Sequence, residues 1–329
     1  MDFNLDETQR ELKQLAADVL SKEGSGEEDE ERLWQAGLLS VCVPEAAGGA
    51  GLGPVEMAVV LREVGARAAP VPALPVLAGQ LLLARHAAPD RQRPPGARLT
   101  LALREPGLPL AGPPRTTARQ GTGGWEVSGR KTGVPQPDGA GVLVTADEGL
   151  FLVEGLAGTP EHTSTGEQAA TIVLDATPAE RVAGPEGARD AVQVFMAAVA
   201  AQASGVLAGA LELTTGYIKQ RKQFGRALAE FQAVTMQIAD VYIAGRALDV
   251  AMWSAAWRLA EGLPAEQDLA LAAYQVGEAV TALYTCQHLH GGLGLDVTYP
   301  LHRYFAQAKH LSHLLGGADA QLDLIGALV

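Results

Sequence analysis

Cysteine is nearly absent from the sequence. The 329 residues include only Cys42 and Cys286, which lie far apart and lack the spacing of metal ligands. A disulfide framework or a zinc site is therefore not expected, and no metal centre is predicted. This cysteine usage fits a reducing compartment, and we predict a cytoplasmic protein.

Positive charge is also in short supply. The chain carries 25 Lys and Arg against 38 Asp and Glu, a net charge of -13. Because no basic stripe can follow a phosphate backbone, nucleic acid is not expected as a partner. Of the residues, 47% are hydrophobic and the mean hydropathy is +0.08. These values indicate a globular protein, and its length predicts two or three domains.

Signals for export and membrane insertion are missing as well. Residues 1–4 contain no basic region, and no apolar run follows them, so no export signal is predicted. The most membrane-like run is Val192–Leu211, which Gln193, Gln202 and Ser204 interrupt. We therefore predict a buried bundle helix here, and no membrane span.

The first two of three successive blocks differ clearly in pattern. Residues 1–93 place apolar side chains at helical spacing and predict an N-terminal α-helical domain. Residues 94–186, after a proline-rich linker, alternate short apolar runs with Gly, Pro and Thr clusters. This middle domain is expected to be a small antiparallel β-barrel or sandwich. Its expected strands are Leu99–Leu103, Trp125–Ser128, Gly141–Ala146, Leu150–Glu154 and Ala170–Leu174.

Long helical patterns return in residues 187–329. They predict an antiparallel four-helix bundle with helices at Val192–Tyr217, Ala229–Glu261, Gln267–His290 and Leu301–Leu315. Helices and strands come in blocks and do not alternate, so the fold class is α+β and not βαβ. The glycine-rich loop at residues 48–53 does not follow a strand, so a dinucleotide-binding Rossmann motif is rejected.

One stretch between two long predicted helices indicates ligand binding. Residues Arg221 to Arg226 read RKQFGR. Arginine presents a planar fork of donors that suits phosphate oxygens, and the N-terminus of the following helix adds its dipole. The stretch therefore predicts an anion site. The alternative is that these cations only cap the C-terminus of the preceding helix.

A second stretch identifies a family resemblance. Residues Cys286 to Gly294 read CQHLHGGLG, and Tyr299 and Pro300 follow. Together with RKQFGR, this stretch resembles the C-terminal domain of the FAD-dependent acyl-CoA dehydrogenases. In that family the two corresponding turns bind the pyrophosphate and adenine end of FAD across a subunit interface. The order of the three predicted domains is also the family's order, so the resemblance implies an acyl-CoA dehydrogenase-like fold.

The resemblance implies which residues bind FAD. His288 stands where the family usually has Gln, and its ring could still hydrogen-bond an adenine or ribose group. Two glycines let the backbone approach the ligand closely. For His288 and His290 the alternative is a helix-end histidine that satisfies carbonyl groups. The implied cofactor-binding residues are Arg221, Gln223, Phe224, Phe231, His288, Gly291 and Gly292.

The catalytic base of the family is missing. In the family a Glu removes the α proton of an acyl-CoA thioester while a hydride leaves Cβ for the flavin. That Glu stands at one of two places, which this chain fills with Phe195 and Leu315. Neither side chain can take a proton, and no Asp or Glu lies between Ala191 and Leu211. We therefore predict no catalytic residue in this chain.

The middle domain has also lost the family's flavin contacts. The family signature T-E-P-x-x-G-S-D survives only in the first part, Arg104 to Gly107. Where the family brings W-I-S/T against the flavin ring, this chain reads Gly133-Val134-Pro135. The aromatic group and the hydroxyl donors are both absent.

This selective loss resembles the short non-catalytic subunits of the α2β2 acyl-CoA dehydrogenases of actinobacterial steroid side-chain degradation. The implied partners are a catalytic acyl-CoA dehydrogenase subunit, an electron-transfer flavoprotein and an acyl-CoA substrate, with FAD as cofactor. Two alternatives stay open. The chain could be a flavin-free structural or binding paralogue, or a self-sufficient dehydrogenase with a relocated base such as Asp240 or Glu212. Both acids are explained equally well as solvated helix faces.

Overall fold

The computed structural model describes residues 3–22 and 24–328. The described chain folds as two compact units. The first, here called the bundle unit, takes in residues 3–22, 58–70 and 199–328. The second, the sheet unit, takes in residues 24–57 and 71–198. The domain boundaries expected at residues 93 and 186 stay a prediction.

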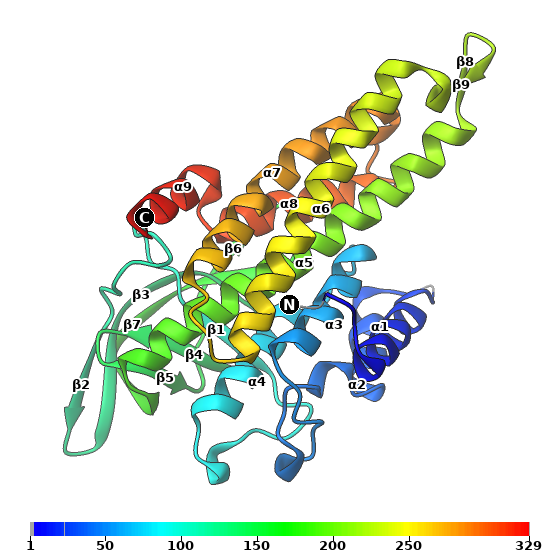
Figure 1. The fold of residues 1–329 in the computed structure, drawn as a ribbon. Helices are drawn as coiled ribbons and strands as arrows, with labels where there is room; N and C mark the ends of the chain where they lie inside the picture. The colour runs from blue at the N-terminus through cyan, green and yellow to red at the C-terminus, as the bar shows by residue number, and fades with distance from the viewer. Residues whose placement is uncertain (1–2, 23, 329) are drawn as a thin grey trace. The chain divides into compact units, whose positions relative to one another are not determined.

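Helices make up the bundle unit (Figure 1). The predicted four-helix bundle is confirmed. Three of its helices lie within three residues of the expected bounds, whereas the first begins at Pro185 and not at Val192. The bundle helices are the C-terminal part of α5 (Pro185–Gln220), α6 (Gln232–Ala260), α7 (Glu266–His290) and α8 (Leu301–Leu314). A further helix, α9 (Gly317–Leu328), was not expected separately. The unit also contains α1 (Glu7–Leu20) and the C-terminal part of α3 (Pro54–Ala66).

Two glycines bring α3 and α5 into backbone contact inside the bundle unit. A Cβ atom at Gly65 would lie 2.0 Å from the carbonyl oxygen of Gln202, and one at Gly205 would lie 1.9 Å from that of Arg62. Such distances exclude any side chain at either position. The close approach places Arg62 of α3 beside Ser204 of α5.

Helix α5 is the one helix of the described residues that is long and apolar enough to cross a membrane. Its most apolar window has a mean hydropathy of 1.8, but 89% of that window is buried inside the protein. Burial of this kind is what a core helix shows, in agreement with the predicted bundle helix.

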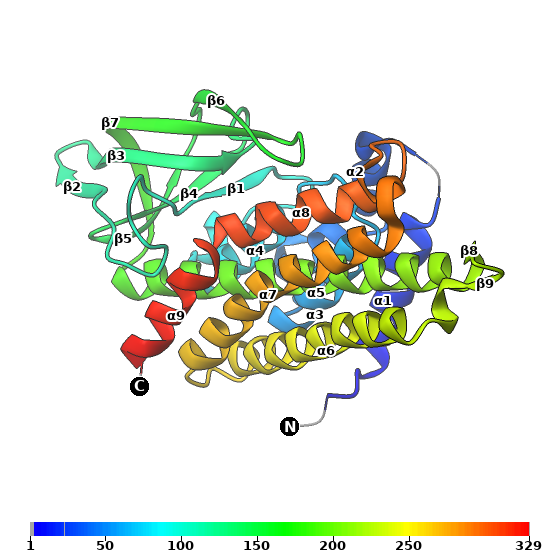
Figure 2. The same cartoon turned by 90° about the horizontal axis from the view of Figure 1, so that it is seen from above.

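The sheet unit is built on seven strands (Figure 2). They follow the order β1-β4-β5-β7-β3-β2, and β6 pairs with β7. The strands are β1 (Leu99–Ala102), β2 (Thr117–Gly121), β3 (Gly124–Pro135), β4 (Gly141–Ala146), β5 (Gly149–Val153), β6 (Thr159–His162) and β7 (Gln168–Ala183). The same unit contains α2 (Gly26–Gln35) and α4 (Ala73–His86).

Two features of the sheet correct the predictions. Strand β1 pairs with β4 in parallel, with Leu99 opposite Gly141, so the sheet is mixed and not wholly antiparallel. Strands β2 and β6 were missed because most of their residues are exposed and they contain no apolar run. The buried core of the sheet comprises Ala102, Ala118, Val127, Val134, Val142, Val144, Ala146, Phe151, Val153, Ile172 and Leu174.

Candidate functional site

The RKQFGR stretch forms a hairpin that projects beyond the ends of α5 and α6 (Figure 1). Strand β8 (Lys222–Gln223) pairs with β9 (Arg226–Ala227) in antiparallel fashion. Phe224 and Gly225 form the turn with φ angles of +50° and +82°. Two positive φ angles in sequence are typical of a type I′ turn. The Leu228 N–H closes the hairpin by donating to the Arg221 carbonyl at 2.9 Å.

The hairpin corrects the predicted connection to the next helix. Ala229 was expected to begin that helix, but it lies in the 3-10 turn η4 (Leu228–Glu230), and α6 begins at Gln232. The N-terminus of α6 therefore does not follow the glycine turn directly. The dipole of α6 is not part of the hairpin, so the donors that the hairpin could offer to an anion are its side chains and backbone N–H groups.

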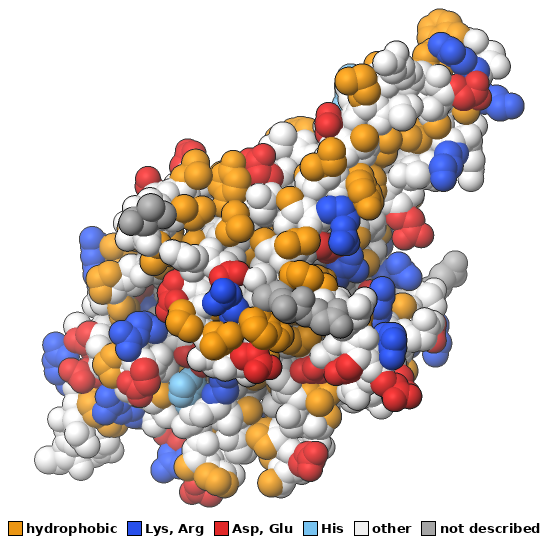
Figure 3. Space-filling view, viewed as in Figure 1, with side chains coloured by type: hydrophobic (Ala, Val, Ile, Leu, Met, Phe, Trp, Pro, Cys, Tyr) orange, Lys and Arg blue, Asp and Glu red, His pale blue; other side chains and the backbone are white. Residues whose placement is uncertain are grey.

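Hydrophobic and cationic side chains gather at the tip of the hairpin (Figure 3). The Phe224 side chain is 93% exposed. It contacts Phe231 edge-on with ring centroids 6.4 Å apart, and the Arg226 guanidinium lies 3.9 Å from the centroid of Phe231. Arg221 and Gln223 are exposed, and no side-chain partner holds either of them in the described part of the chain. Their donors are free to bind a ligand or another chain.

The second predicted segment lies where α7 ends. Gly291 has φ +62° and ψ -140°, a backbone conformation that is almost restricted to glycine. A Cβ atom at Gly291 or at Gly292 would meet nothing within 4 Å, so the surface over the turn η5 (Gly291–Leu295) is open. The side chain of His288 is exposed on the last turn of α7.

His290 connects the two segments. It is buried, and its Nδ1–H donates to the Cys286 carbonyl at 2.8 Å. This bond leaves Nε2 to accept the hydroxyl of Tyr299 at 3.1 Å. Burial lowers the pKa of His290 and favours this neutral form, although the bond to Cys286 opposes the shift. The Tyr217 ring stacks on His290 at 4.3 Å, one helical turn before Arg221.

The stacked pair places the hairpin and the Gly291 turn at the same end of the bundle unit. For His290 the alternative function as a helix-end histidine is confirmed, whereas His288 keeps an exposed ring. Sequence reasoning missed Tyr217 and Tyr299 as supports. Their only signal was an aromatic residue one turn before Arg221 and another just after the glycine turn.

Exposed donors and an open glycine turn at the same end of the bundle unit fit the phosphate-rich end of a dinucleotide. A guanidinium, an amide and accessible backbone N–H groups are the donors that bind phosphate oxygens. The donor set therefore fits the pyrophosphate and adenine end of FAD.

The sheet unit does not offer the flavin-ring side of such a site. The remnant of the family signature supplies Glu105, whose carboxylate accepts from Lys131 Nζ at 2.7 Å and from Thr116 Oγ1 at 2.7 Å. It also accepts from the backbone N–H groups of Arg115 and Thr116. Lys131 is fully buried. Glu105 therefore stabilises the sheet unit and has no free oxygen for a ligand.

The position at which the family carries its flavin-stacking aromatic residue has no room for such a side chain in this structure. Gly133 has φ +61° and lies in an irregularity of β3 between Lys131 and Val134. A Cβ atom there would lie 3.0 Å from Nη1 of Arg104. The next residue, Val134, is buried in the sheet core. An indole ring at Gly133 would need both the backbone and Arg104 to move.

Neither of the two positions at which the family carries its catalytic Glu holds an acid in this chain. Phe195 is 5% exposed and Leu315 is 1% exposed, and both are apolar. The two candidate relocated bases, Asp240 and Glu212, are exposed on the helices α6 and α5. An exposed carboxylate lacks the desolvation that abstraction of a weakly acidic proton requires.

Two models of acyl-CoA dehydrogenase domains and a known relative match this chain. The model of the N-terminal domain of acyl-CoA dehydrogenases matches residues 6–93, and that of the C-terminal domain matches residues 184–329. Acyl-CoA dehydrogenase FadE28 of Mycobacterium tuberculosis is 38% identical, with 99% of this chain and 98% of that protein covered.

Two solved structures of complexes are also similar. A chain of a variant of the Tcur3481-Tcur3483 steroid ACAD superposes with a TM-score of 0.91 at 38% identity, covering 98% of this chain and 97% of that one. A chain of the ChsE4-ChsE5 complex from Mycobacterium tuberculosis gives a TM-score of 0.89 at 33% identity, covering 99% and 98%.

Proposed function

The chain belongs to the acyl-CoA dehydrogenase family of oxidoreductases, whose cofactor is FAD, and on this premise we propose that it is the non-catalytic subunit of a heteromeric acyl-CoA dehydrogenase. In the proposed complex this chain contributes one half of an FAD site. A second, catalytic acyl-CoA dehydrogenase subunit contributes the other half. An α2β2 assembly is the arrangement we propose.

One observation carries the proposal. The exposed donors and the open glycine turn lie at the same end of the bundle unit, while the family's two base positions hold the buried apolar residues Phe195 and Leu315. Selection for a lone enzyme would not keep the first feature and lose the second. Both are expected of a chain that completes the cofactor site of another subunit.

Each remaining site residue has a defined role in this proposal. When bound, FAD would supply the hydride acceptor for the oxidation of the acyl-CoA thioester. Arg221 and Gln223 of this chain hold its pyrophosphate by charged and amide hydrogen bonds. Phe224 and Phe231 pack beside it, and Arg226 is kept in place by its contact with Phe231. His288, Gly291 and Gly292 line the adenine and ribose.

The partner subunit supplies what this chain lacks. It provides the Glu base, the contacts to the flavin ring and the channel for CoA, and the electrons pass on to an electron-transfer flavoprotein. The substrate class we propose is a steroid side-chain acyl-CoA. Support for this class comes from the similarity to the steroid ACAD complex, because the residues of this chain do not contact the acyl group in the proposal.

Arg221 is the residue that tests the proposal. We expect Arg221→Ala in the complex to weaken FAD binding by roughly 1–3 kcal/mol, because a charged hydrogen bond to phosphate is lost. Arg221→Lys keeps the charge but loses the planar fork, so an intermediate loss is expected. Lys219→Ala is the matched control, since it removes an exposed cation two residues away on the last turn of α5.

The readout is the FAD content of the purified complex after desalting, together with the Kd from titration of the apo complex. Unchanged FAD binding in Arg221→Ala would favour a flavin-free structural paralogue. A lone chain that carries full FAD and turns over acyl-CoA would instead favour a self-sufficient dehydrogenase and end the proposal.

A further inference from the structure

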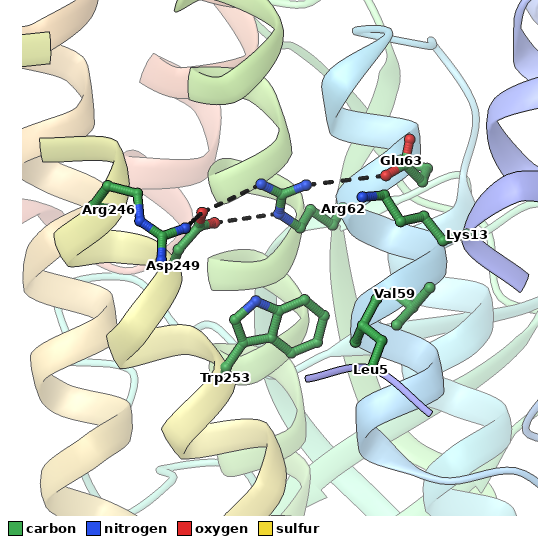
Figure 4. Close-up of a pocket in the computed structure, with 8 residues that line it drawn as sticks. All are labelled: Leu5, Lys13, Val59, Arg62, Glu63, Arg246, Asp249 and Trp253. Atoms are coloured by element: carbon green, nitrogen blue, oxygen red, sulfur yellow. Dashed lines mark hydrogen bonds and ion pairs between the residues drawn. The ribbon is translucent and has the colours of Figure 1, made fainter. Parts of the chain in front are cut away.

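The bundle unit contains a polar cavity that is separate from the proposed FAD site. It has a volume of about 180 Å³ and lies among the N-terminal segment, α1, α3 and α6 (Figure 4). None of the residues implied to bind FAD lines it. Lys13 and Arg246 are exposed, but Arg62, Glu63 and Asp249 are largely buried. Since buried charges are costly unless they are paired, these three groups require an explanation.

Asp249 of α6 is the most fully bonded group of this cavity. Its carboxylate accepts from Nε and Nη2 of Arg62 at 3.2 and 3.3 Å, and from Nη1 of Arg246 at 3.2 Å. It also accepts from the hydroxyl of Ser204. Four donors saturate the two carboxylate oxygens. Asp249 therefore holds Arg62 in place and offers nothing to a ligand.

Arg62 keeps one nitrogen that this bonding does not use. Its Nη1 lies 4.0 Å from the carboxylate of Glu63, which is beyond hydrogen-bond reach, and no hydrogen bond from Nη1 is found among the described residues. The amine of Lys13, on α1, points toward the same space from the mouth of the cavity (Figure 4). Two cationic donors thus face one cavity without a hydrogen-bonded acceptor.

The rest of the lining is apolar. Val59 of α3, Leu5 of the N-terminal segment and the indole of Trp253 form the other walls (Figure 4). Among the residues that the structure describes, the charged groups of the lining are the cations Lys13, Arg62 and Arg246 and the carboxylates of Asp249 and Glu63, which sum to a formal charge of +1.

We propose that this cavity binds a small monocarboxylate with an apolar body. The carboxylate would accept from Nη1 of Arg62 and from Nζ of Lys13, and the carbon chain would lie against Val59 and Trp253. One negative charge neutralises the lining. Glu63, near Nη1, would repel a dianion such as phosphate. A cavity of about 180 Å³ has room for several water molecules, and so for a short carboxylate such as hexanoate.

The proposal does not depend on the FAD site, so either can fail without the other. Ligands of about eight heavy atoms with one charged group bind with Kd values of roughly 1 mM. Isothermal titration of the full chain with hexanoate should therefore give saturable binding in that range. Hexan-1-ol, hexylamine and inorganic phosphate are the controls, and none should bind at this site.

Variants with opposite expected effects locate the binding. Lys13→Glu should weaken hexanoate binding at least tenfold, whereas Glu63→Gln should strengthen it several-fold because the repelling carboxylate is gone. Arg10→Glu is the matched control, since Arg10 is an exposed cation of α1 that does not line the cavity. It should leave the Kd within twofold. Circular dichroism confirms that each variant is folded.

Three results would overturn the proposal. Hexanoate could fail to bind at a concentration 10 times the expected Kd. Hexan-1-ol could bind as tightly as hexanoate. The variants Lys13→Glu and Arg10→Glu could change the Kd for hexanoate by the same factor. The first result would show that the cavity does not bind a carboxylate. The second would show that the carboxylate group is not recognised, and the third that hexanoate binds elsewhere on the chain.

Discussion

The buried pair of Glu105 and Lys131 gives a stability prediction of defined size. The side chain of Lys131 is 0% exposed and that of Glu105 is 6% exposed. Glu105→Gln keeps the shape but leaves the Lys131 ammonium without its counter-charge. Removal of one partner of a buried ion pair costs about 3–5 kcal/mol. We expect this loss in the free energy of unfolding, measured by urea denaturation followed by circular dichroism.

A double variant and a surface variant make the result specific. Glu105→Gln combined with Lys131→Met removes both charges and should recover much of the loss, since an apolar replacement of a buried pair is often neutral. Arg119→Gln breaks the exposed pair with Asp147 in the same unit, at 3.0 Å, and should cost less than about 1 kcal/mol. If Glu105→Gln costs no more than Arg119→Gln, the reasoning about burial is refuted.

The same pair predicts a dependence on pH. Burial raises the pKa of Glu105, but the hydrogen bonds from Lys131 and Thr116 and the charge of Lys131 outweigh it, so its pKa lies below the ordinary 4.5. The carboxylate then binds fewer protons in the folded state than in the unfolded state. Its stabilisation is complete above pH 4.5 and is lost as the pH falls through the folded pKa. The Gln variant should lack this part of the acid destabilisation.

Two further predictions concern the proposed FAD half-site. Gly291→Ala forces a side chain into the glycine conformation at a cost of about 1–3 kcal/mol, and both the melting temperature and the FAD content of the complex should fall. Gly326→Ala, inside α9 with open space around it, is its control and should be neutral or slightly stabilising. Phe224→Asn relieves the left-handed strain of a bulky residue, about 1–2 kcal/mol. The Leu228 N–H should then exchange more slowly with solvent, yet the complex should retain less FAD because the Phe224 ring is lost. Equal or higher FAD retention would show that the Phe224 ring does not contact FAD.

The helices of the bundle were the most predictable part of the fold. The periodicity of residues 267–290 placed α7 within one residue at its N-terminal end, because a long buried face repeats the helical signal many times. Strand β4 was predicted at its observed bounds for a similar reason, since all six of its residues are buried. Strands β2 and β6 give no such signal, and the parallel pairing of β1 with β4 depends on contacts between distant parts of the chain.

The site residues stay a prediction, and the geometry around them was only partly predictable from the sequence. The sequence placed Arg221 and Gly291 in one ligand site through the family resemblance, and the structure places them at one end of the bundle unit. It did not predict the hairpin, because Phe224 in a left-handed conformation contradicts the preference of bulky residues. Nor did it predict the cluster of Arg62, Ser204 and Asp249, whose members lie 142 and 187 residues from Arg62 along the chain.

The most direct measurement is the FAD content of this chain alone and in complex with a catalytic acyl-CoA dehydrogenase subunit. We predict that the lone chain retains almost no flavin and has no dehydrogenase activity. Co-expression with the partner should yield a yellow complex whose activity depends on the partner's Glu. A lone chain with stoichiometric FAD and acyl-CoA dehydrogenase activity would contradict the proposed division of the site between two subunits.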